Sequence, residues 1–250
     1  MPQRIIANHE SEVPFLKRVG VIGGMGQWAT LDILNRIFRA SVDFPVPQYG
    51  NRGYPPMDIR MVNKAPMILN SDGSYPDALE PSPTLLEAAK FVGKNSDFLI
   101  CTSNTAHIFA KEIEKAAGKP LLSLVDVAIQ EAKRRNCRRV GVMAIGVTLR
   151  EGLFQGPLKK IGVESVLLPV ELGYKLDEEG IYPVQQGGDP QEFSKVACDA
   201  IDYLRGEGVD GIILGCTEIP LLLGDKANES DIINPSQLIA EAVISKVLEI

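Results

Sequence analysis

The sequence predicts an α/β fold of two pseudo-symmetric domains, each a mainly parallel sheet flanked by helices, with an active site in the cleft between them. Short β-branched runs alternate with longer helical patterns along the chain, which is typical of βαβ units. The alternation restarts near residue 140 with a strand that resembles the first one. Polar turns follow equivalent strands of the two halves, and α/β folds bind ligands at the carboxyl ends of parallel strands.

The first half contains four predicted strands, at residues 19–22, 57–61, 98–101 and 121–124. Helical patterns accompany them at residues 29–41, 83–93, 104–117 and 127–135. The first helix has its apolar residues at helical spacing, namely Leu31, Leu34, Ile37 and Phe38. The proline- and glycine-rich segment 44–56 is the long loop of this half, and such loops are commonly functional.

The second half repeats this order, with strands at residues 140–143, 163–168 and 211–214. Helices are predicted at residues 149–161, 194–206 and 235–248, and segment 180–190 is the long loop. We therefore divide the chain into an N-terminal extension (1–18), a first domain (19–118 together with 221–250) and a second domain (119–220).

One register superposes the two halves. In this register the strand after Asp97 matches the strand after Asp210. The same shift places Ser103 on Cys216, two polar residues that each follow an apolar strand. Because one strand can match another by chance, the ordered match of several strands carries the inference. A pseudo-two-fold relation between the halves would turn these two positions toward each other.

Composition limits the classes of partner. The 250 residues have a formal net charge of −6, whereas a nucleic-acid surface needs a basic stripe. No apolar run reaches membrane-spanning length, so neither nucleic acid nor a membrane is an expected partner. Four widely separated cysteines and two histidines fit neither a disulfide framework nor a metal site. We expect a cytoplasmic, reducing setting and no metal.

A glycine-rich turn follows the first predicted strand. Its segment 24–29 (GMGQWA) matches a G-x-G-x-x-A dinucleotide fingerprint, but the acidic residue expected after the next strand is missing. A glycine turn at a helix N-terminus also binds a small carboxylate through backbone N–H groups. We expect Gly24 and Met25 to contact such a ligand, and no dinucleotide to bind.

Two further turns carry polar side chains. Residues 103–107 (SNTAH) follow a strand and open a helix, a pattern that also suits a plain helix N-cap. In the corresponding turn 215–218 (GCTE), Cys216 lies at a helix start, where free N–H groups stabilise a thiolate. The alternative for Cys216 is a buried, inert thiol, which is how we interpret the other three cysteines. His107 is either a satisfied structural histidine or a residue that orients the site.

The combination of GGMG at 23–26, SNTAH at 103–107 and GCTE at 215–218 resembles the aspartate/glutamate racemase family, from residue 19 to the C-terminus. The resemblance implies cofactor-independent racemisation of an acidic amino acid by two domains, commonly in a homodimer. In the family, two thiols act on opposite faces of Cα. Cys216 matches one of these thiols, and Ser103 stands where the other would be.

The resemblance also implies which residues hold the substrate. Asn104 and Thr105 match the substrate-holding positions of the family. Thr148 falls where the family has a threonine after the first strand of the second half. Thr217 and Glu218 complete the GCTE segment beside the matched thiol and are counted with the substrate-binding residues.

The expected reaction is the conversion of L-aspartate to D-aspartate, with glutamate as the other acidic substrate. Cys216 as a thiolate would take the α-proton, and Ser103 would face the opposite side of Cα. Arg52 and Lys175, in the long loops of the two halves, are candidates for the side-chain carboxylate, or are solvated loop charges. Two alternatives stay open: a one-thiol decarboxylase or isomerase of a dicarboxylate, and a ligand-binding protein that has lost racemase chemistry.

Overall fold

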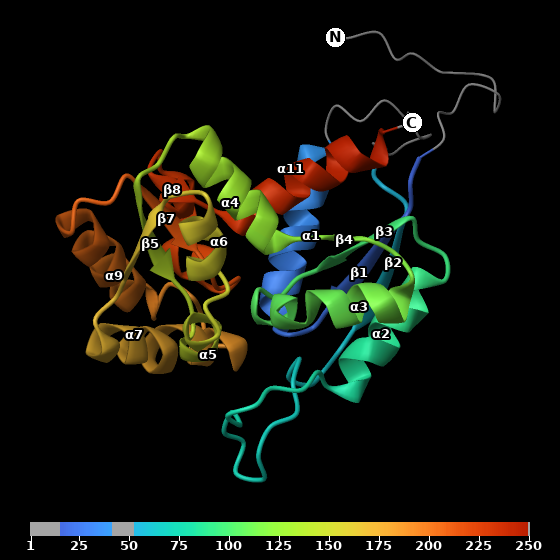
Figure 1. The fold of residues 1–250 in the computed structure, drawn as a ribbon, viewed down its shortest axis with the longest axis horizontal. Coiled ribbons are helices and arrows are strands. Elements are labelled where there is room, and N and C mark those ends of the chain that lie inside the picture. The colour runs from blue at the N-terminus through green and yellow to red at the C-terminus, as the bar shows by residue number, and fades with distance from the viewer. Residues whose placement is uncertain (1–15, 42–52, 250) are drawn as a thin grey trace, which may run out of the picture.

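The computed structural model describes residues 16–41 and 53–249, which form two lobes that each contain a four-stranded parallel sheet (Figure 1). The strand order in the first lobe is β2 (Met57–Met61), β1 (Val19–Gly23), β3 (Phe98–Cys101) and β4 (Leu121–Leu122). Helices α1 (Gln27–Ala40) and α11 (Pro235–Val247) cover one face of this sheet. The other face packs against α2 (Pro83–Gly93) and α3 (Ala110–Ala117).

The second lobe repeats this architecture. Its strand order is β6 (Glu164–Leu167), β5 (Arg139–Met143), β7 (Gly211–Leu214) and β8 (Ile232–Ile233). One face packs against α4 (Leu124–Arg134) and α6 (Gln155–Lys160). The other face is covered by α7 (Val170–Leu176), α8 (Tyr182–Gln185), α9 (Ser194–Gly206) and α10 (Ile219–Leu223).

The two sheets confirm the predicted fold class. Both place the first strand of the lobe second in the order and the third strand beside it. An aspartate anchors the start of the third strand in each lobe: Asp97 accepts the N–H of Arg18 at 2.7 Å, and Asp210 accepts the N–H of Arg138 at 2.8 Å. The internal repeat in the sequence is therefore a structural repeat.

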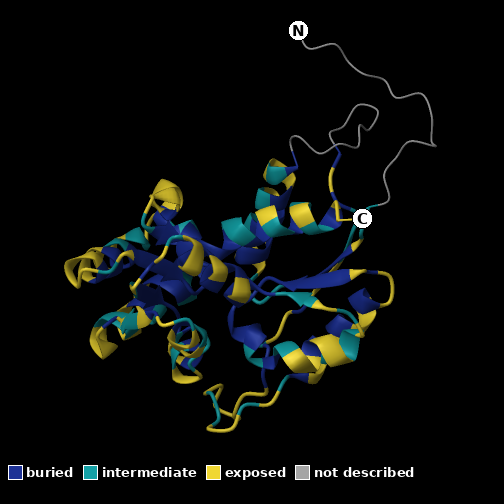
Figure 2. Ribbon diagram, turned by 45° about the horizontal axis from the view of Figure 1, so that its top comes forward, coloured by how far each residue is buried: buried dark blue, intermediate teal, exposed yellow. Residues whose placement is uncertain are grey.

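The central strands of both sheets are buried, and the outer strands are not (Figure 2). Every residue of β1, β3 and β7 is buried, whereas β2 and β6 are partly exposed at the sheet edges. Strands buried on both faces by helices are typical of parallel sheets. The turns that follow β1, β3 and β7 are thus carried by the best-packed parts of the molecule.

Two strands lie beyond the expected domain boundaries. Leu121–Leu122 pairs with β3 of the first sheet, although the second domain was expected to begin at residue 119. Ile232–Ile233 pairs with β7 of the second sheet, although residues 221–250 were assigned to the first domain. The first of these lies within the predicted strand 121–124, whereas Ile232–Ile233 was not predicted, because two residues are too short for a periodic pattern.

Three predicted segments differ in their helical structure. The expected helix 149–161 consists of α5 (Gly146–Arg150) and α6, because Gly152 takes a left-handed φ of 64° between them. The expected helix 104–117 begins with a 3₁₀ turn, Thr105–Phe109, before α3. The expected loop 180–190 is helical up to Gln185, and Gly180 packs closely against α9, where an added Cβ would lie 2.9 Å from Val196. Most of the first-half loop 44–56 lies outside the described residues.

Candidate active site

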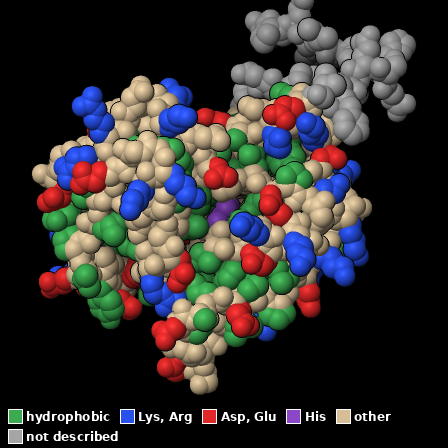
Figure 3. Space-filling model, viewed as in Figure 1, with side chains coloured by type: hydrophobic (Ala, Val, Ile, Leu, Met, Phe, Trp, Pro, Cys, Tyr) green, Lys and Arg blue, Asp and Glu red, His purple; other side chains and the backbone are tan. Residues whose placement is uncertain are grey.

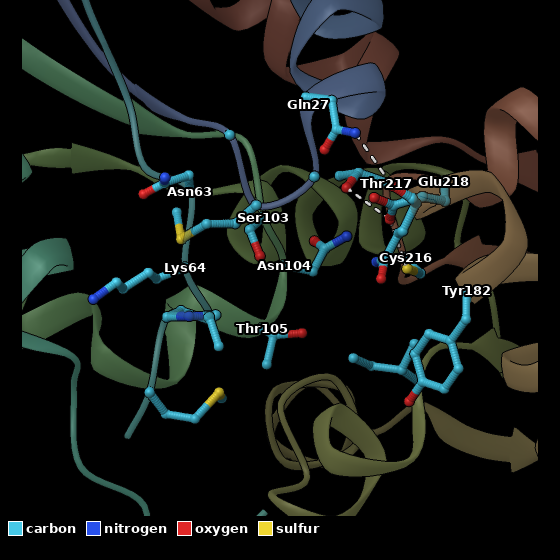
Figure 4. A pocket seen from close by; sticks show the side chains of 18 of the residues that line it. Gln27, Asn63, Lys64, Ser103, Asn104, Thr105, Tyr182, Cys216, Thr217 and Glu218 are labelled. Carbon is cyan, nitrogen blue, oxygen red and sulfur yellow. Dashed lines mark hydrogen bonds between the residues drawn. The ribbon is translucent and has the colours of Figure 1, made fainter. Parts of the chain in front are cut away.

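A cavity of about 330 Å³ lies between the two lobes. The turns after β1, β3 and β7 line it, together with the loop after β2 and helix α8 (Figure 4). Its polar and charged lining residues include Gln27, Asn63, Lys64, Ser103, Asn104, Thr105, Tyr182, Cys216, Thr217 and Glu218. The structure therefore brings together the two positions that the internal register pairs.

The turn after β3 directs Ser103 and Asn104 into the cavity (Figure 4). The N–H of Thr102 donates to Ile22 at 2.9 Å, and its hydroxyl lies 2.7 Å from that of Thr30, so the turn is fixed to β1 and α1. Asn104 is only 3% exposed, and neither polar atom of its amide has a hydrogen-bond partner among the described residues. Because an unpaired buried polar group costs about 1–3 kcal/mol, this amide is well suited to bind a polar ligand.

His107 holds the backbone of this turn and not the Ser103 hydroxyl. Its Nε2 accepts the N–H of Leu124 at 3.1 Å, so Nδ1 carries the proton and donates to the Ser103 carbonyl oxygen at 2.8 Å. Burial lowers the pKa of His107 to about 4, which keeps the imidazole neutral near pH 7. Of the two roles left open by the sequence, the contacts favour the structural one.

The turn after β7 carries Cys216. Gly215 approaches the Phe154 ring so closely that a Cβ would lie 2.8 Å from it. The Cys216 thiol donates to Oε2 of Glu218 at 3.1 Å. Burial, and then the Glu218 carboxylate, raise the pKa of Cys216 well above its ordinary value. This net direction is opposite to the expected stabilisation of the thiolate by a helix N-terminus, because burial and the Glu218 carboxylate outweigh the one backbone hydrogen bond, from Glu218, that lowers the pKa.

The glycine turn after β1 differs from the expected carboxylate cradle. Gly24 has a φ of 94°, and a Cβ there would lie 2.5 Å from a backbone carbonyl oxygen, so only glycine fits. Its N–H donates to Thr30 at 2.9 Å and is not free for a ligand. The carboxyl next to this turn belongs to Glu218, whose Oε1 would lie 2.9 Å from a Cβ on Gly26. Gly24 and Met25 nevertheless line the cavity.

Threonine side chains join the lobes around the cavity. The hydroxyl of Thr105 lies 2.9 Å from that of Thr148, so the 3₁₀ turn of the first lobe is linked to α5 of the second. Thr148 is fully buried and supports Thr105 without lining the cavity. Thr217 donates to the carbonyl oxygen of Thr102 at 3.4 Å, which forms a second link.

The cations expected at the site are placed differently. Lys175 is exposed on α7, where Leu176 faces the core, and it lines a separate surface hollow with Glu179. Arg52 lies outside the described residues. Among the described lining residues Lys64 is the only cation, and its ammonium group points away from Cys216 (Figure 4).

Sequence reasoning missed several lining residues. Tyr75 reaches the cavity from the loop after β2, and Tyr182 and Gln185 reach it from α8. The two tyrosines come from different lobes. No motif indicates them, because they reach the cavity only when the two lobes pack together.

The described surface shows no concentrated charge on the face seen in Figure 3, where acidic and basic side chains are interspersed around a hollow. Within residues 16–41 and 53–249, no three histidine, cysteine or acidic side chains gather in a way that could hold a metal ion. No helix in the described part of the chain is long and apolar enough to cross a membrane.

Comparison with known proteins finds similarity to amino-acid racemases over most of the chain. The chain is 24% identical to the broad specificity amino-acid racemase RacX of Bacillus subtilis over 234 aligned residues. This alignment covers 92% of this chain and 98% of that protein. The chain is 29% identical to glutamate racemase of Aquifex aeolicus over 176 aligned residues. This alignment covers 68% of this chain but only 64% of that enzyme. The structure of Picrophilus torridus aspartate racemase shares the fold, with a TM-score of 0.76 at 23% identity and coverage of 92% and 94%.

The match to a family extends over most of the described structure. The family described as Asp/Glu/Hydantoin racemase matches residues 22–243, which include both sheets except the first residues of β1, and all three turns that line the cavity. This chain therefore belongs to the Asp/Glu/Hydantoin racemase family.

Proposed function

We propose that this chain racemises an acidic amino acid, aspartate first, without a cofactor. The observation that carries the proposal is the meeting of Ser103 and Cys216 at one cavity, from equivalent turns of two related lobes. A racemase must reach both faces of Cα, and two side chains on opposing lobes meet that requirement. The unpaired amide of Asn104 supplies a polar contact for the substrate between them.

The chemistry requires stabilisation of negative charge. The α-proton of an amino acid is a very weak acid, so its removal by Cys216 leaves charge that spreads into the α-carboxylate. Fixed hydrogen-bond donors stabilise such charge in a site that excludes water. Asn104 offers its amide N–H groups, and the Thr105–Thr148 pair needs only one of its two hydroxyl protons for itself. These residues are the proposed holders of the α-carboxylate.

The partner of the side-chain carboxylate is proposed to be a cation at the rim of the cavity. Lys64 lines the cavity and takes the place that the sequence suggested for Lys175. A flexible lysine can turn its ammonium group toward a bound anion. Arg52 stays a prediction. Cytoplasmic location and assembly as a homodimer also stay predictions, and light scattering of the purified protein would test the homodimer.

The one-thiol alternative has one observation in its favour. Ser103 stands at the position paired with Cys216, and Cys101, one strand position deeper, is fully buried with a pKa raised by burial to about 12. Among the described residues the cavity thus presents one thiol. A dicarboxylate decarboxylase or isomerase that uses one thiol would fit the same site.

The proposal is tested by incubating protein dialysed against chelator with L-aspartate or L-glutamate, with no added cofactor. Racemisation to an equal mixture, followed by circular dichroism and chiral chromatography, is the expected result. Turnover of malonate or maleate with no reaction of either amino acid would favour the one-thiol alternative. No reaction with any of them would favour a ligand-binding protein and contradict the proposal.

A further inference from the structure

We propose that Glu218 is the proton acceptor of Cys216, which takes the thiol proton so that the sulfur can accept the α-proton of the substrate. The inference rests on the proposed racemase function and assigns the group that deprotonates the Cys216 thiol. The thiol donates directly to Oε2 of Glu218 at 3.1 Å, and the two residues are 6% and 2% exposed. A direct hydrogen bond between a nucleophile and a base is the geometry that such a transfer needs.

The surroundings of Cys216 disfavour a thiolate on balance. Burial raises the pKa of the thiol, the nearby carboxyl groups of Glu218 and Asp177 raise it further, and together they outweigh a backbone hydrogen bond from Glu218 that lowers it. Lys64 is the only cation among the described lining residues, and its ammonium group points away from the sulfur. A free thiolate would therefore be rare, whereas a thiol that passes its proton to an adjacent carboxylate adds no net charge to the site.

Burial makes Glu218 a better acceptor than an ordinary carboxylate. Desolvation raises the pKa of Glu218, so its affinity for a proton moves toward that of the thiol. Gly26 leaves room for the carboxyl, since a Cβ there would lie 2.9 Å from Oε1, and the Thr217 hydroxyl shares its one proton between Oε2 and the Thr102 carbonyl, each at 3.4 Å. Oε2 is thus held by neighbours in the second lobe, whereas Oε1 is buried next to Gly26 of the first lobe with no hydrogen-bond partner among the described residues.

The step balances in protons and electrons. The proton on Sγ of Cys216 moves to Oε2 of Glu218, and the S–H electron pair stays on sulfur. The sulfur then forms a new S–H bond with the α-proton, and the Cα–H electron pair spreads into the α-carboxylate. A proton from solvent reaches Cα on the Ser103 face, and Glu218 returns its proton to solvent when the product leaves. The other titratable groups near the pair are Asp177, Tyr75 and Tyr182.

The test is the rate of Cys216 alkylation by iodoacetamide as a function of pH, read by mass spectrometry of the peptide that contains it. If thiol and carboxylate share one proton, the fraction of thiolate with a protonated Glu218 is independent of pH between their two ionisations. The wild-type rate should then be flat between about pH 7 and 9, because the raised pKa of Cys216 places the second ionisation of the pair above this range. In the variant Glu218→Gln the rate should rise about tenfold per pH unit, because the thiol ionises alone.

A matched control separates proton transfer from charge alone. Asp177→Asn removes a carboxyl that acts on Cys216 through space without a hydrogen bond to it, and should keep the flat profile. Racemase activity of Glu218→Gln should fall by about 10²-fold or more, with thermal unfolding like that of the wild type.

A wild-type alkylation rate that rises tenfold per pH unit would overturn the assignment, and so would equal profiles in the wild type and Glu218→Gln. The wild-type result does not depend on the folding of any variant. Alkylation is measured without substrate, so a protein that shows the flat profile but does not racemise aspartate would contradict the proposed function and keep the Cys216–Glu218 pair.

Discussion

The turns after β3 and β7 hold equivalent places in two related lobes, but they carry different chemistry. In the first, the Ser103 hydroxyl has no hydrogen-bond partner among the described residues, and the Ser103 carbonyl is bound by His107. In the second, the Cys216 thiol is bound to the carboxyl of Glu218. A symmetric backbone therefore supports an acid–base pair on one side of the cavity and a neutral hydroxyl on the other.

This difference limits how the two faces of a substrate can react. A serine hydroxyl is far less acidic than a thiol, whose reference pKa is about 8.5, so Ser103 is a poor proton carrier. His107 cannot activate it, because both ring nitrogens are engaged with the backbone. Free L- and D-amino acids have equal energy in water, so the equilibrium constant stays at one. Unequal proton transfer on the two faces of Cα can therefore appear only in the rates of the two directions and in the exchange of the α-proton with solvent.

The largest expected effect comes from making the two turns alike. Cys216→Ser should lower racemase activity by about 10³-fold or more, because the site then has a hydroxyl on both faces and no thiol. The fold should survive this small change, as thermal unfolding will show. If the variant kept more than a few per cent of the activity, Cys216 would be removed from the mechanism.

The second effect concerns His107, which binds the backbone of the Ser103 turn and has no counterpart in the Cys216 turn. The pKa of His107 is lowered to about 4 in the folded protein from 6.5, so the unfolded chain binds more protons between these values. The contribution of His107 to the free energy of unfolding is therefore fully present above pH 6.5 and is lost as the pH falls toward 4. The loss should be on the order of 3 kcal/mol, measured by urea unfolding from pH 4 to 7.

His107→Gln should remove this part of the pH dependence. Asp177, whose pKa is raised by burial to about 6, acts in the opposite direction in both proteins, because its folded form binds the extra proton and gains stability as the pH falls. The comparison between wild type and variant therefore cancels it. An unchanged slope in the variant would show that His107 does not hold the turn as a neutral ring.

A smaller effect should follow from supplying the missing thiol. Ser103→Cys should raise the slower direction of racemisation by about tenfold and make the exchange behaviour of the two enantiomers alike. Ser103→Ala is the matched control and should not produce this gain. If Ser103→Cys were no better than Ser103→Ala, the identity of this side chain would not be what distinguishes the faces.

The smallest expected effect concerns the link between the lobes. Thr105→Val and Thr148→Val each remove one hydroxyl of the 2.9 Å pair, and a double-mutant cycle should give a coupling of about 1 kcal/mol in the free energy of unfolding. Additive single-variant losses would mean that the two hydroxyls do not stabilise each other.

The fold was predictable because its signals are local and repeated. Alternating strand and helix patterns indicate parallel sheets, and the restart at Val140 places Ser103 and Cys216 in one register. The two-residue strand β8 has no pattern of its own and is defined by its pairing with β7. The break at Gly152 was missed because a single glycine also occurs inside helices.

The site was predictable where residues follow buried strands and not where loops reach over them. Asn104 and Thr217 follow β3 and β7, and the strands bring them to the cavity. Tyr75 and Lys64 reach it from an irregular segment, whose path depends on the packing of both lobes. Lys175 could not be placed from sequence, because its direction depends on where α7 begins.

The most direct test of unequal faces is exchange at Cα in heavy water, with L- and D-aspartate incubated separately and no cofactor added. Deuterium is followed by NMR and inversion by chiral chromatography. The enantiomer that presents its proton to Cys216 should gain deuterium without inversion faster than it racemises, because the thiol exchanges its proton and returns it to the same face. The other enantiomer should gain deuterium mainly by inverting. Equal exchange and inversion from both enantiomers would contradict the account.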